Sequence, residues 1–247
     1  PFNSYLRALI SLFFKRIMAS PDFHFKRFSI IQEGVTHPVG TDGVLLGAWI
    51  NVSGAWRMLD IGTGTGVIAL MLAQRTEIHP DTFIEAVEIH PGSALRAARN
   101  FEASHWADRL RVREIPVQEF AQNTERPFDL IVSNPPFFSE TTRAPDETRR
   151  LGRHTGTLPP GEMLAAVRRL LAPGGRFAAV LPVQEGIRLC ELSVPNGLYW
   201  TRITEVRSRR DKPVERLLIE FEKNPYDFKR ESLLIHEDGI HYSDEYQ

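Results

Sequence analysis

The sequence of 247 residues contains one cysteine, Cys190. A single cysteine cannot form a disulfide within the chain, and it cannot supply the several thiolates of a structural zinc site. The chain also carries almost no net charge, because 30 Lys and Arg residues balance 31 Asp and Glu residues. A uniformly basic nucleic-acid coat is therefore excluded, and any polyanion must be met by local basic clusters. We expect a cytoplasmic protein that binds no metal.

Long apolar runs are missing as well. Residues 1–20 come closest, but Arg7, Lys15 and Arg16 interrupt their apolar residues, which argues against a targeting or membrane segment. The spacing of these apolar residues is typical of an amphipathic helix. We predict a helical N-terminal extension over residues 1–22, one catalytic domain over residues 23–247, no membrane partner, and a monomer, with oligomers left open. The apolar face of the extension would comprise Leu6, Leu9, Ile10, Phe13, Phe14 and Ile17.

From residue 57 onward, short apolar runs alternate with segments of helical periodicity. This alternation predicts a parallel sheet with helices on both faces. Two longer runs near the C-terminus flank the turn-forming segment RRDKPV and predict an antiparallel hairpin at one edge. The segment APGG is expected to end a helix over residues 163–175. Strands are expected over residues 57–61, 82–89, 110–115, 128–133, 176–182, 198–208 and 215–223. This α/β pattern of seven strands resembles the Rossmann-like architecture of class I methyltransferases.

Three alternate glycines follow the first of these strands in the segment LDIGTGTGVIAL, at Gly62, Gly64 and Gly66. Without side chains, they let the backbone turn sharply and approach a ligand closely. The GxGxG spacing differs from the GxGxxG fingerprint of dinucleotide sites, because position 67 is valine. For this motif alone, a purely structural turn is the alternative.

Two acids lie at strand ends, Asp60 after the first strand and Glu88 after the second. Open parallel sheets bind ligands at the carboxyl ends of their strands. A carboxylate at the position of Glu88 can accept hydrogen bonds from both hydroxyls of a ribose. The alternative for either acid is a solvated loop charge or a helix cap.

The segment DIGTGTG followed by Glu88 resembles the S-adenosylmethionine site of class I methyltransferases. The resemblance implies that Glu88 holds the cofactor ribose and that the backbone of residues 62–64 meets its methionine portion. In that family an acid after the third strand often contacts the adenine, but Pro116 occupies this position here. The adenine contact is then expected from the backbone of Val117, or from the side chains of Gln118 or Glu119.

The segment SNPPFF follows the fourth strand directly, at residues 133–138. An exocyclic amine on a purine is a poor nucleophile because its lone pair is delocalised into the ring. The side-chain oxygen of Asn134 and the carbonyl of Pro135 can accept hydrogen bonds from such an amine and stabilise its developing charge. Pro135 and Pro136 fix two φ angles, and Phe137 offers a flat face on which a base can stack. The alternative is a strand-ending turn with core phenylalanines.

NPP followed by an aromatic residue resembles the signature of methyltransferases that act on planar amines. Residues 23–50, with the block VGTDGVLLGAW, further resemble the bacterial tRNA1(Val) (adenine-N6)-methyltransferase family, and the similarity extends over nearly all of residues 23–222. The resemblance implies methylation of the adenine amino group at position 37 of the tRNA anticodon loop. The alternatives are guanine N2 of ribosomal RNA, glutamine N5 of a protein, which Phe137 disfavours, and a non-catalytic RNA-binding protein of this fold.

The remaining site residues are polar or basic. Thr41 and Asp42 lie in a polar turn before the apolar segment VLLGAWI, which predicts a helix over the cofactor site, with both residues near the methionine end. Basic clusters are expected to bind RNA phosphates, although each could equally be a solvated surface, and His154 could be structural. The clusters comprise Lys26, Arg27, Arg143, Arg149, Arg150, Arg153, His154, Arg207, Arg209, Arg210 and Lys212.

Overall fold

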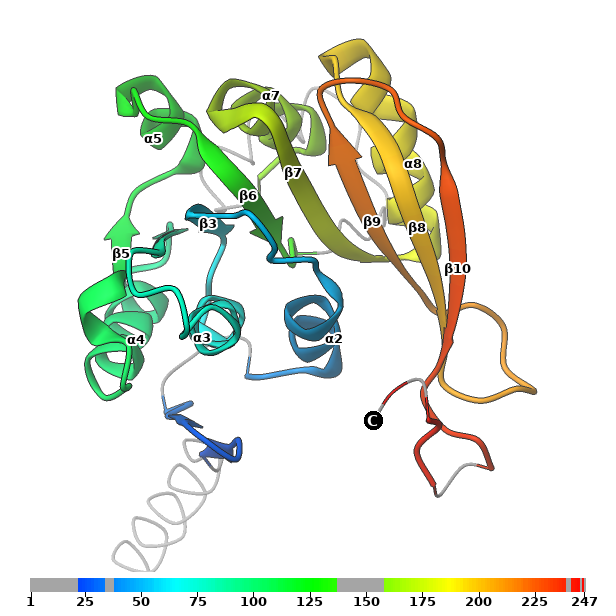
Figure 1. Ribbon diagram of the computed structural model, residues 1–247, viewed down its shortest axis with the longest axis horizontal. Helices are drawn as coiled ribbons and strands as arrows, with labels where there is room; N and C mark the ends of the chain where they lie inside the picture. The colour runs from blue at the N-terminus through cyan, green and yellow to red at the C-terminus, as the bar shows by residue number, and fades with distance from the viewer. Residues whose placement is uncertain (1–21, 34–37, 137–157, 239–240, 245, 247) are drawn as a thin grey trace, which may run out of the picture.

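An eight-stranded sheet forms the centre of the protein (Figure 1). The computed structural model describes residues 22–33, 38–136, 158–238, 241–244 and 246. The strand order is β10-β8-β9-β7-β6-β3-β4-β5, and only β9 runs antiparallel to its neighbours. The predicted α/β class with a mostly parallel sheet is therefore confirmed. The strands are β3 (Arg57–Ile61), β4 (Phe83–Glu88), β5 (Leu110–Glu114), β6 (Phe128–Ser133), β7 (Leu171–Pro182), β8 (Tyr199–Arg207), β9 (Arg216–Glu222) and β10 (Lys229–Leu234).

The sheet has one strand more than the seven expected. The predicted antiparallel pair forms as β8 and β9, but β10 covers β8, so this pair does not make the edge of the sheet. β10 pairs with β8 in parallel, from Lys229 opposite Arg202 to Leu234 opposite Arg207. Its first four residues are exposed, so it lacks the apolar pattern of a buried strand. Because β10 is parallel to β8, it delivers the C-terminal segment to the edge where β3 to β7 end.

Helices cover both faces of the sheet (Figure 1). Residues of β3 alternate between two cores: Met58 packs with one helix layer, whereas Leu59 and Ile61 pack with the other. Burial on both faces explains why the central strands β3 and β6 are mostly apolar. The first layer contains α2 (Thr41–Trp49), α3 (Val67–Arg75) and α4 (Pro91–Glu102), and the second contains α5 (Val117–Asn123), α7 (Pro160–Leu170) and α8 (Val183–Ser193).

Two glycines allow α2 to pack closely against α3. A Cβ atom at Gly47 would lie 2.7 Å from the sulfur of Met71, and one at Gly43 would lie 3.4 Å from a methyl carbon of Val67. Residues four apart lie on the same face of a helix, so both glycines contact α3. The close approach places the first turn of α2 beside the glycine turn that precedes α3.

The start of β7 differs from the prediction. The segment APGG was expected to end a helix, but α7 ends at Leu170 and the strand begins at Leu171. The pairing of β6 with β7 shifts register just after Leu171, which identifies an irregularity in the ladder. Gly174 has a φ angle of +72°, and a Cβ atom at Gly175 would lie 2.9 Å from the carbonyl oxygen of Phe128. Close approach of two backbones, rather than helix termination, accounts for the glycine pair.

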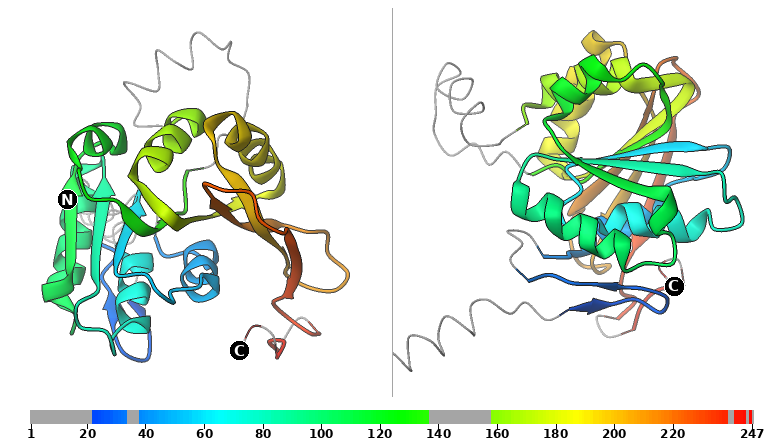
Figure 2. Two further views of the ribbon diagram at one scale, coloured as in Figure 1. Left: turned by 45° about the horizontal axis from the view of Figure 1, so that its top comes forward. Right: turned by 90° about the vertical axis from the view of Figure 1, so that its left-hand side faces the viewer.

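A small hairpin of β1 (Phe23–His24) and β2 (Ser29–Ile30) lies outside the layer of α3 and α4 (Figure 2). The buried side chain of Asn100 in α4 connects it to the rest of the domain. Its oxygen accepts a hydrogen bond from the Ile31 N–H at 3.0 Å, and its nitrogen donates to the carbonyls of Ile31 and Thr65 at 3.2 and 2.8 Å. One side chain thus holds the hairpin against the glycine turn.

The predicted N-terminal helix lies in residues 1–21, outside the described residues, so it stays a prediction. None of the helices in the described ranges is both long and apolar enough to span a membrane. Within the same ranges, the His, Cys, Asp and Glu side chains form no group of three or more that could hold a metal ion.

Candidate active site

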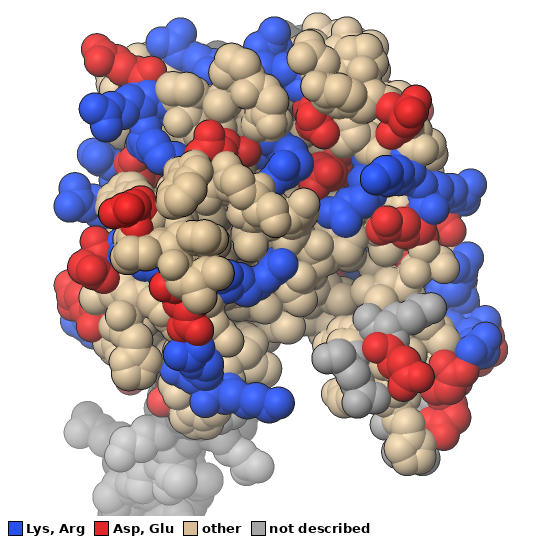
Figure 3. Space-filling view, viewed as in Figure 1, with Lys and Arg blue, Asp and Glu red and all other residues tan. Residues whose placement is uncertain are grey.

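A cavity of about 1580 Å³ opens at the carboxyl ends of β3, β4, β5 and β6. Figure 3 shows the surface hollowed between the first helix layer and the segment that follows β10. The walls come from the start of α2, the glycine turn, the segment after β6, and the C-terminal segment. Pockets for one small ligand are usually about 300–1,000 Å³. This cavity therefore has room for a cofactor and a second group beside it.

The glycine turn forms the floor of the cavity. Gly62 and Gly64 have φ angles of +70° and +57°, and no atom lies within 4 Å of the position that a Cβ would take at either residue. Gly66 has a φ angle of +84°, and a Cβ there would lie 2.5 Å from the ring of Phe101. The first two glycines thus leave open space for a ligand, whereas the third is required for packing against α4.

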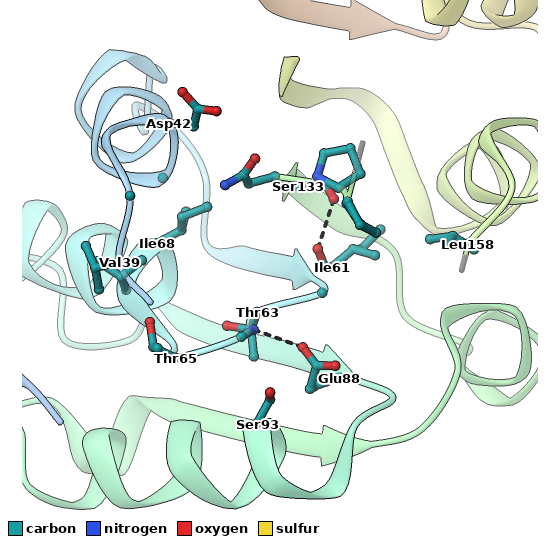
Figure 4. Close-up of a pocket in the computed structure, with 18 of the residues that line it drawn as sticks. Val39, Asp42, Ile61, Thr63, Thr65, Ile68, Glu88, Ser93, Ser133 and Leu158 are labelled. Carbon is teal, nitrogen blue, oxygen red and sulfur yellow. Dashed lines mark hydrogen bonds between the residues drawn. The ribbon is translucent and has the colours of Figure 1, made fainter. Parts of the chain in front are cut away.

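Glu88 lies at the end of β4 and lines the cavity, although it is largely buried. Its carboxylate accepts hydrogen bonds from the N–H groups of Gly64 and His90, each at 2.9 Å; Figure 4 shows the one to Gly64. A carboxylate has about four acceptor positions, so these bonds leave capacity for two hydroxyl donors. The two backbone donors also fix its orientation, which suits the recognition of a ribose.

Asp60 does not line the cavity, so a direct cofactor contact is not supported. Its side chain is fully buried, and Oδ2 accepts a hydrogen bond from the Thr63 hydroxyl at 2.6 Å. Burial raises the pKa of Asp60 to about 7, although the Thr63 bond opposes this rise. Asp60 thus supports the glycine turn from behind.

Asp60 should make the stability of the protein depend on pH. Its pKa is 3.8 when exposed and about 7 in the folded state, so its contribution is greatest below pH 4 and falls as the pH rises toward 7. Asp60→Asn should remove this loss. The difference in free energy of unfolding between Asp60→Asn and the wild type should therefore shift by about 3 kcal/mol in favour of the variant from pH 5 to pH 8. Urea denaturation at both pH values measures this gain, and equal differences at the two would contradict it.

Thr41 and Asp42 both line the cavity, in the first turn of α2. The expected helix forms, but its N-cap is Gly40, which provides no side-chain cap. The carboxylate of Asp42 accepts a hydrogen bond from Nε of Arg216 at 2.9 Å, which connects α2 to the start of β9. In Figure 4, Asp42 lies across the cavity from Glu88. Sequence reasoning missed Arg216, because nothing in the segment KPVER distinguishes it.

The three alternatives for the cofactor adenine lie together. Val117 begins α5, and Val117, Gln118 and Glu119 all line the cavity. The amide nitrogen of Gln118 donates a hydrogen bond to Glu162 of α7 at 2.8 Å. This bond leaves the carbonyl oxygen of Gln118 as the branch that can accept from a ligand. The position of the acid that often contacts the adenine in class I methyltransferases is occupied by Pro116, which is the N-cap of α5.

Asn134 lies directly after β6 and lines the cavity. The hydroxyl of the preceding Ser133 donates to the carbonyl of Ile61 at 2.9 Å, which fixes the end of β6 against β3 (Figure 4). The amide nitrogen of Asn134 lies 4.0 Å from the position of a Cβ at Gly43 and therefore on the α2 side. No hydrogen bond is formed by the half-buried Asn134 side chain with any other described residue. Its amide is therefore available to a ligand.

The two prolines of the motif also line the cavity, Pro135 buried and Pro136 exposed. Phe137 lies outside the described residues, so its stacking role stays a prediction. The same holds for the basic cluster after the motif, which comprises Arg143, Arg149, Arg150, Arg153 and His154.

The other predicted RNA contacts lie in two places. Lys26 and Arg27 belong to the small hairpin, and Arg27 forms an ion pair with Glu77 at 2.5 Å. Glu77 follows α3 and precedes β4, so Arg27 lies where the strands begin, at the opposite edge from Asn134. This position does not support contact with RNA at the cavity.

Arg209 and Arg210 occupy the turn between β8 and β9, next to Ser208, which lines the cavity. Arg209 pairs with Asp211 at 3.4 Å, and Arg210 pairs with Glu237. Exposed pairs of this kind are weak, so phosphates can compete for these arginines.

Known proteins resemble both the sequence and the fold. The family model described as "Methyltransferase small domain" matches residues 44–188. Among solved structures, a predicted O-methyltransferase from Agrobacterium tumefaciens aligns with a TM-score of 0.63 at 19% identity, covering 83% of this chain and 92% of that one. TrmN from Thermus thermophilus aligns with a TM-score of 0.54 at 22% identity, covering 74% and 49%. At such identities the likeness supports the Rossmann-like methyltransferase fold alone.

Curated relatives are more similar. A protein from Tolumonas auensis named tRNA1(Val) (adenine(37)-N6)-methyltransferase is 41% identical over 229 residues, covering 93% of this chain and 94% of the relative. A protein of the same name from Trichodesmium erythraeum is 39% identical over 230 residues, covering 93% and 95%. Matches over 93% of the chain include both the glycine turn and the segment after β6. The chain therefore belongs to the small-domain methyltransferases and, within them, to the tRNA1(Val) (adenine(37)-N6)-methyltransferase family.

Proposed function

We propose that this protein transfers a methyl group from S-adenosylmethionine to the N6 amino group of adenine 37 in the anticodon loop of tRNA. The observation that carries the proposal is the position of the Asn134 amide, which shares one cavity with the glycine turn and Glu88 and forms no hydrogen bond with another described residue. The name of the relatives supports the same substrate. Because these relatives match nearly the full chain, guanine N2, glutamine N5 and a non-catalytic role are not favoured.

The cofactor half of the cavity fits S-adenosylmethionine. Glu88 has acceptor capacity for the ribose hydroxyls, and the open space at Gly62 and Gly64 lets the backbone approach the methionine portion. Thr41 and Asp42 would lie beside the same portion, and Val117 beside the adenine. When bound, S-adenosylmethionine supplies a methyl group carried by a positively charged sulfur.

Asn134 and Pro135 would hold the substrate amine. The nitrogen of the Asn134 amide lies on the α2 side, so its oxygen is the branch left to accept from the adenine N6–H. The Pro135 carbonyl would accept the second hydrogen, and together they favour a pyramidal nitrogen with its lone pair out of conjugation. Neither acceptor titrates near neutral pH, so no strong base is needed. As the new carbon–nitrogen bond forms, the methyl carbon–sulfur bond would break and a neutral thioether would leave, and the extra proton on the nitrogen would pass to water.

The prolines reduce the ordering needed on binding. The rings of Pro135 and Pro136 fix the φ angle of each residue. This restricts the backbone that carries the two acceptors, the Asn134 side-chain oxygen and the Pro135 carbonyl. The Ser133 hydrogen bond to β3 fixes the start of the segment. An adenine in an anticodon loop is already unpaired, which lowers the cost of moving it into the cavity.

The proposal is tested by identifying the methylated nucleoside. The protein is incubated with methyl-labelled S-adenosylmethionine and an unmodified transcript of tRNA1(Val), and the RNA is digested and separated. We expect label in N6-methyladenosine, and none in a transcript in which adenine 37 is replaced by guanine. Label in N2-methylguanosine, or equal label in both transcripts, would overturn the assignment.

A further inference from the structure

Three aromatic side chains stack on one another in the C-terminal segment. The ring centroids of His236 and Tyr242 are 4.8 Å apart with an angle of 24° between the planes, and those of Tyr242 and Tyr246 are 5.0 Å apart at 27°. All three residues line the same cavity as Asn134 and Glu88. Tyr242, the middle ring, is 52% exposed. These rings, which we call the aromatic stack, therefore remain accessible from the cavity.

Backbone hydrogen bonds hold the aromatic stack in place. His236 and Tyr242 form an antiparallel bridge, and the N–H of Ser243 donates to the carbonyl of Ile235 at 2.9 Å. The N–H of His236 donates to the carbonyl of Ser208 at 3.0 Å, which connects the segment to the end of β8. These bonds position the rings of His236 and Tyr242 before any ligand binds, which lowers the cost of binding.

One end of the aromatic stack is anchored in the protein. Tyr246 packs against the core beneath α2 and α3, and burial raises the pKa of its hydroxyl. The core therefore explains Tyr246, but it does not explain the half-exposed Tyr242 or its contact with His236. Exposed flat rings at the wall of a polar cavity suit a flat, partly polar ligand. An unpaired nucleobase has these properties, and base stacking on aromatic residues tolerates any base.

Cations lie close to the aromatic stack. Arg207 and Arg210 line a neighbouring hollow together with Tyr242. The carboxylates of Glu237 and Asp244 line the same hollow. Arg210 is paired with Glu237 at the surface, where ion pairs contribute little and can exchange for a phosphate. Lys212, in the same turn as Arg210, forms no ion pair with any residue in the described ranges. A phosphate beside a stacked base can therefore bind Arg210 by replacing Glu237, in a hollow where two arginines lie with two carboxylates.

We propose that the aromatic stack is a second base-binding site, which holds an unpaired nucleobase next to the target adenine. The RNA strand would enter the cavity with the target at Asn134 and its neighbour stacked on His236, the end of the aromatic stack opposite the anchored Tyr246. This inference rests on the proposed RNA substrate. It adds a contact that recognises the single-stranded loop without reading its sequence.

Fluorescent RNA tests the aromatic stack. Anticodon stem-loops carry 2-aminopurine at position 36 or 38, and binding is measured with S-adenosylhomocysteine present so that no transfer occurs. With the wild type, we expect quenching at one of these positions, since stacking quenches 2-aminopurine. His236→Leu should abolish the quenching and raise Kd for the RNA about 5-fold to 100-fold. His236→Phe keeps a flat ring and should retain both the quenching and the affinity.

The control is Tyr226→Leu, because Tyr226 is 58% exposed and does not line the cavity. It should bind RNA like the wild type, and Kd for S-adenosylmethionine should be unchanged in every variant. If His236→Leu lowers the melting temperature markedly, Tyr242→Leu replaces it, because Tyr242 is the ring that supports His236, and the same loss is expected.

Either of two results would overturn the inference and leave the proposed function intact. One is a wild type that methylates the RNA but shows quenching at neither position, and the other is full quenching and affinity in a folded His236→Leu. A wild type that neither binds nor methylates RNA would remove both the inference and the proposed function.

Discussion

Asn134→Ala should lower kcat for methyl transfer about 100-fold to 1,000-fold, the range seen when one preorganised group that stabilises developing charge is removed. The side chain has no hydrogen-bond partner among the described residues, so its loss leaves no protein group unpaired. The effect should therefore fall on the reacting amine and not on folding. Single-turnover rates at saturating tRNA measure the loss, and calorimetry should find Kd for S-adenosylmethionine nearly unchanged.

A second substitution distinguishes the acceptor from the donor of the amide. Asn134→Asp keeps oxygen acceptors at the same reach but has no N–H group. If the oxygen holds the substrate amine, Asn134→Asp should retain more turnover than Asn134→Ala. Equal losses in the two variants would favour the amide nitrogen as the active group, and an unchanged kcat in Asn134→Ala would remove the clamp altogether.

Much of the fold could be predicted because its signals are local. Buried parallel strands are continuously apolar, and this pattern identified β3, β4 and β6 directly from the sequence. Glycines at sites of positive φ are also a local signal, and Gly62 and Gly64 lie in the predicted turn. For Glu88 and Asn134, the position at a strand end was sufficient, because parallel strands end at one edge.

Contacts between distant segments could not be predicted in this way. Arg216 and Asp42 are 174 positions apart, and no periodicity connects them. β10 is recognised by its pairing with β8 and not by its composition, because most of its side chains are exposed. The aromatic stack depends in turn on β10, which brings its rings to the cavity. The same limit applies to Arg27, whose charge suggested contact with RNA although it lies at the edge of the sheet opposite Asn134.

Asp60 is a different case, because a local signal was available. Successive side chains of a strand point to opposite faces, so Asp60 lies on the same face as Met58. Met58 belongs to the core beneath α2, α3 and α4. Alternation therefore predicts a buried Asp60, whereas the rule that acids at strand ends face the ligand predicts an exposed one. The structure follows the alternation.

The cavity joins two parts of the chain with separate tasks. The glycine turn and Glu88 come from the first strand–helix–strand unit and would hold the cofactor. The β8–β9 turn and the aromatic stack come from the last elements of the chain and would hold RNA. Asn134 lies after β6, whose partners β3 and β7 lead to these two parts. Substitutions in either half should therefore change the affinity for one ligand and spare the other.

Glu88→Ala should show this separation from the cofactor side. It removes two acceptors for the ribose, and each hydrogen bond to a charged group contributes about 1.5–3 kcal/mol, or about 10-fold to 150-fold in Kd. It also frees the N–H groups of Gly64 and His90, which now donate to the carboxylate. We expect calorimetry to find Kd for S-adenosylmethionine raised at least about 100-fold. Glu88→Gln keeps one acceptor, so its Kd for S-adenosylmethionine should lie between those of the wild type and Glu88→Ala.

The matched control is Glu215→Ala, which removes a carboxylate from the opposite wall of the same cavity. If the loss of cofactor affinity in Glu88→Ala came only from the changed charge of the cavity, both variants should weaken cofactor binding to a similar extent. If Glu88 binds the ribose directly, Glu215→Ala should leave that Kd near the wild-type value. The Kd for tRNA should be unchanged in Glu88→Ala, and kcat should recover at saturating cofactor, because the substituted group never contacts the adenine amine. A normal cofactor Kd in Glu88→Ala would place the ribose elsewhere in the cavity.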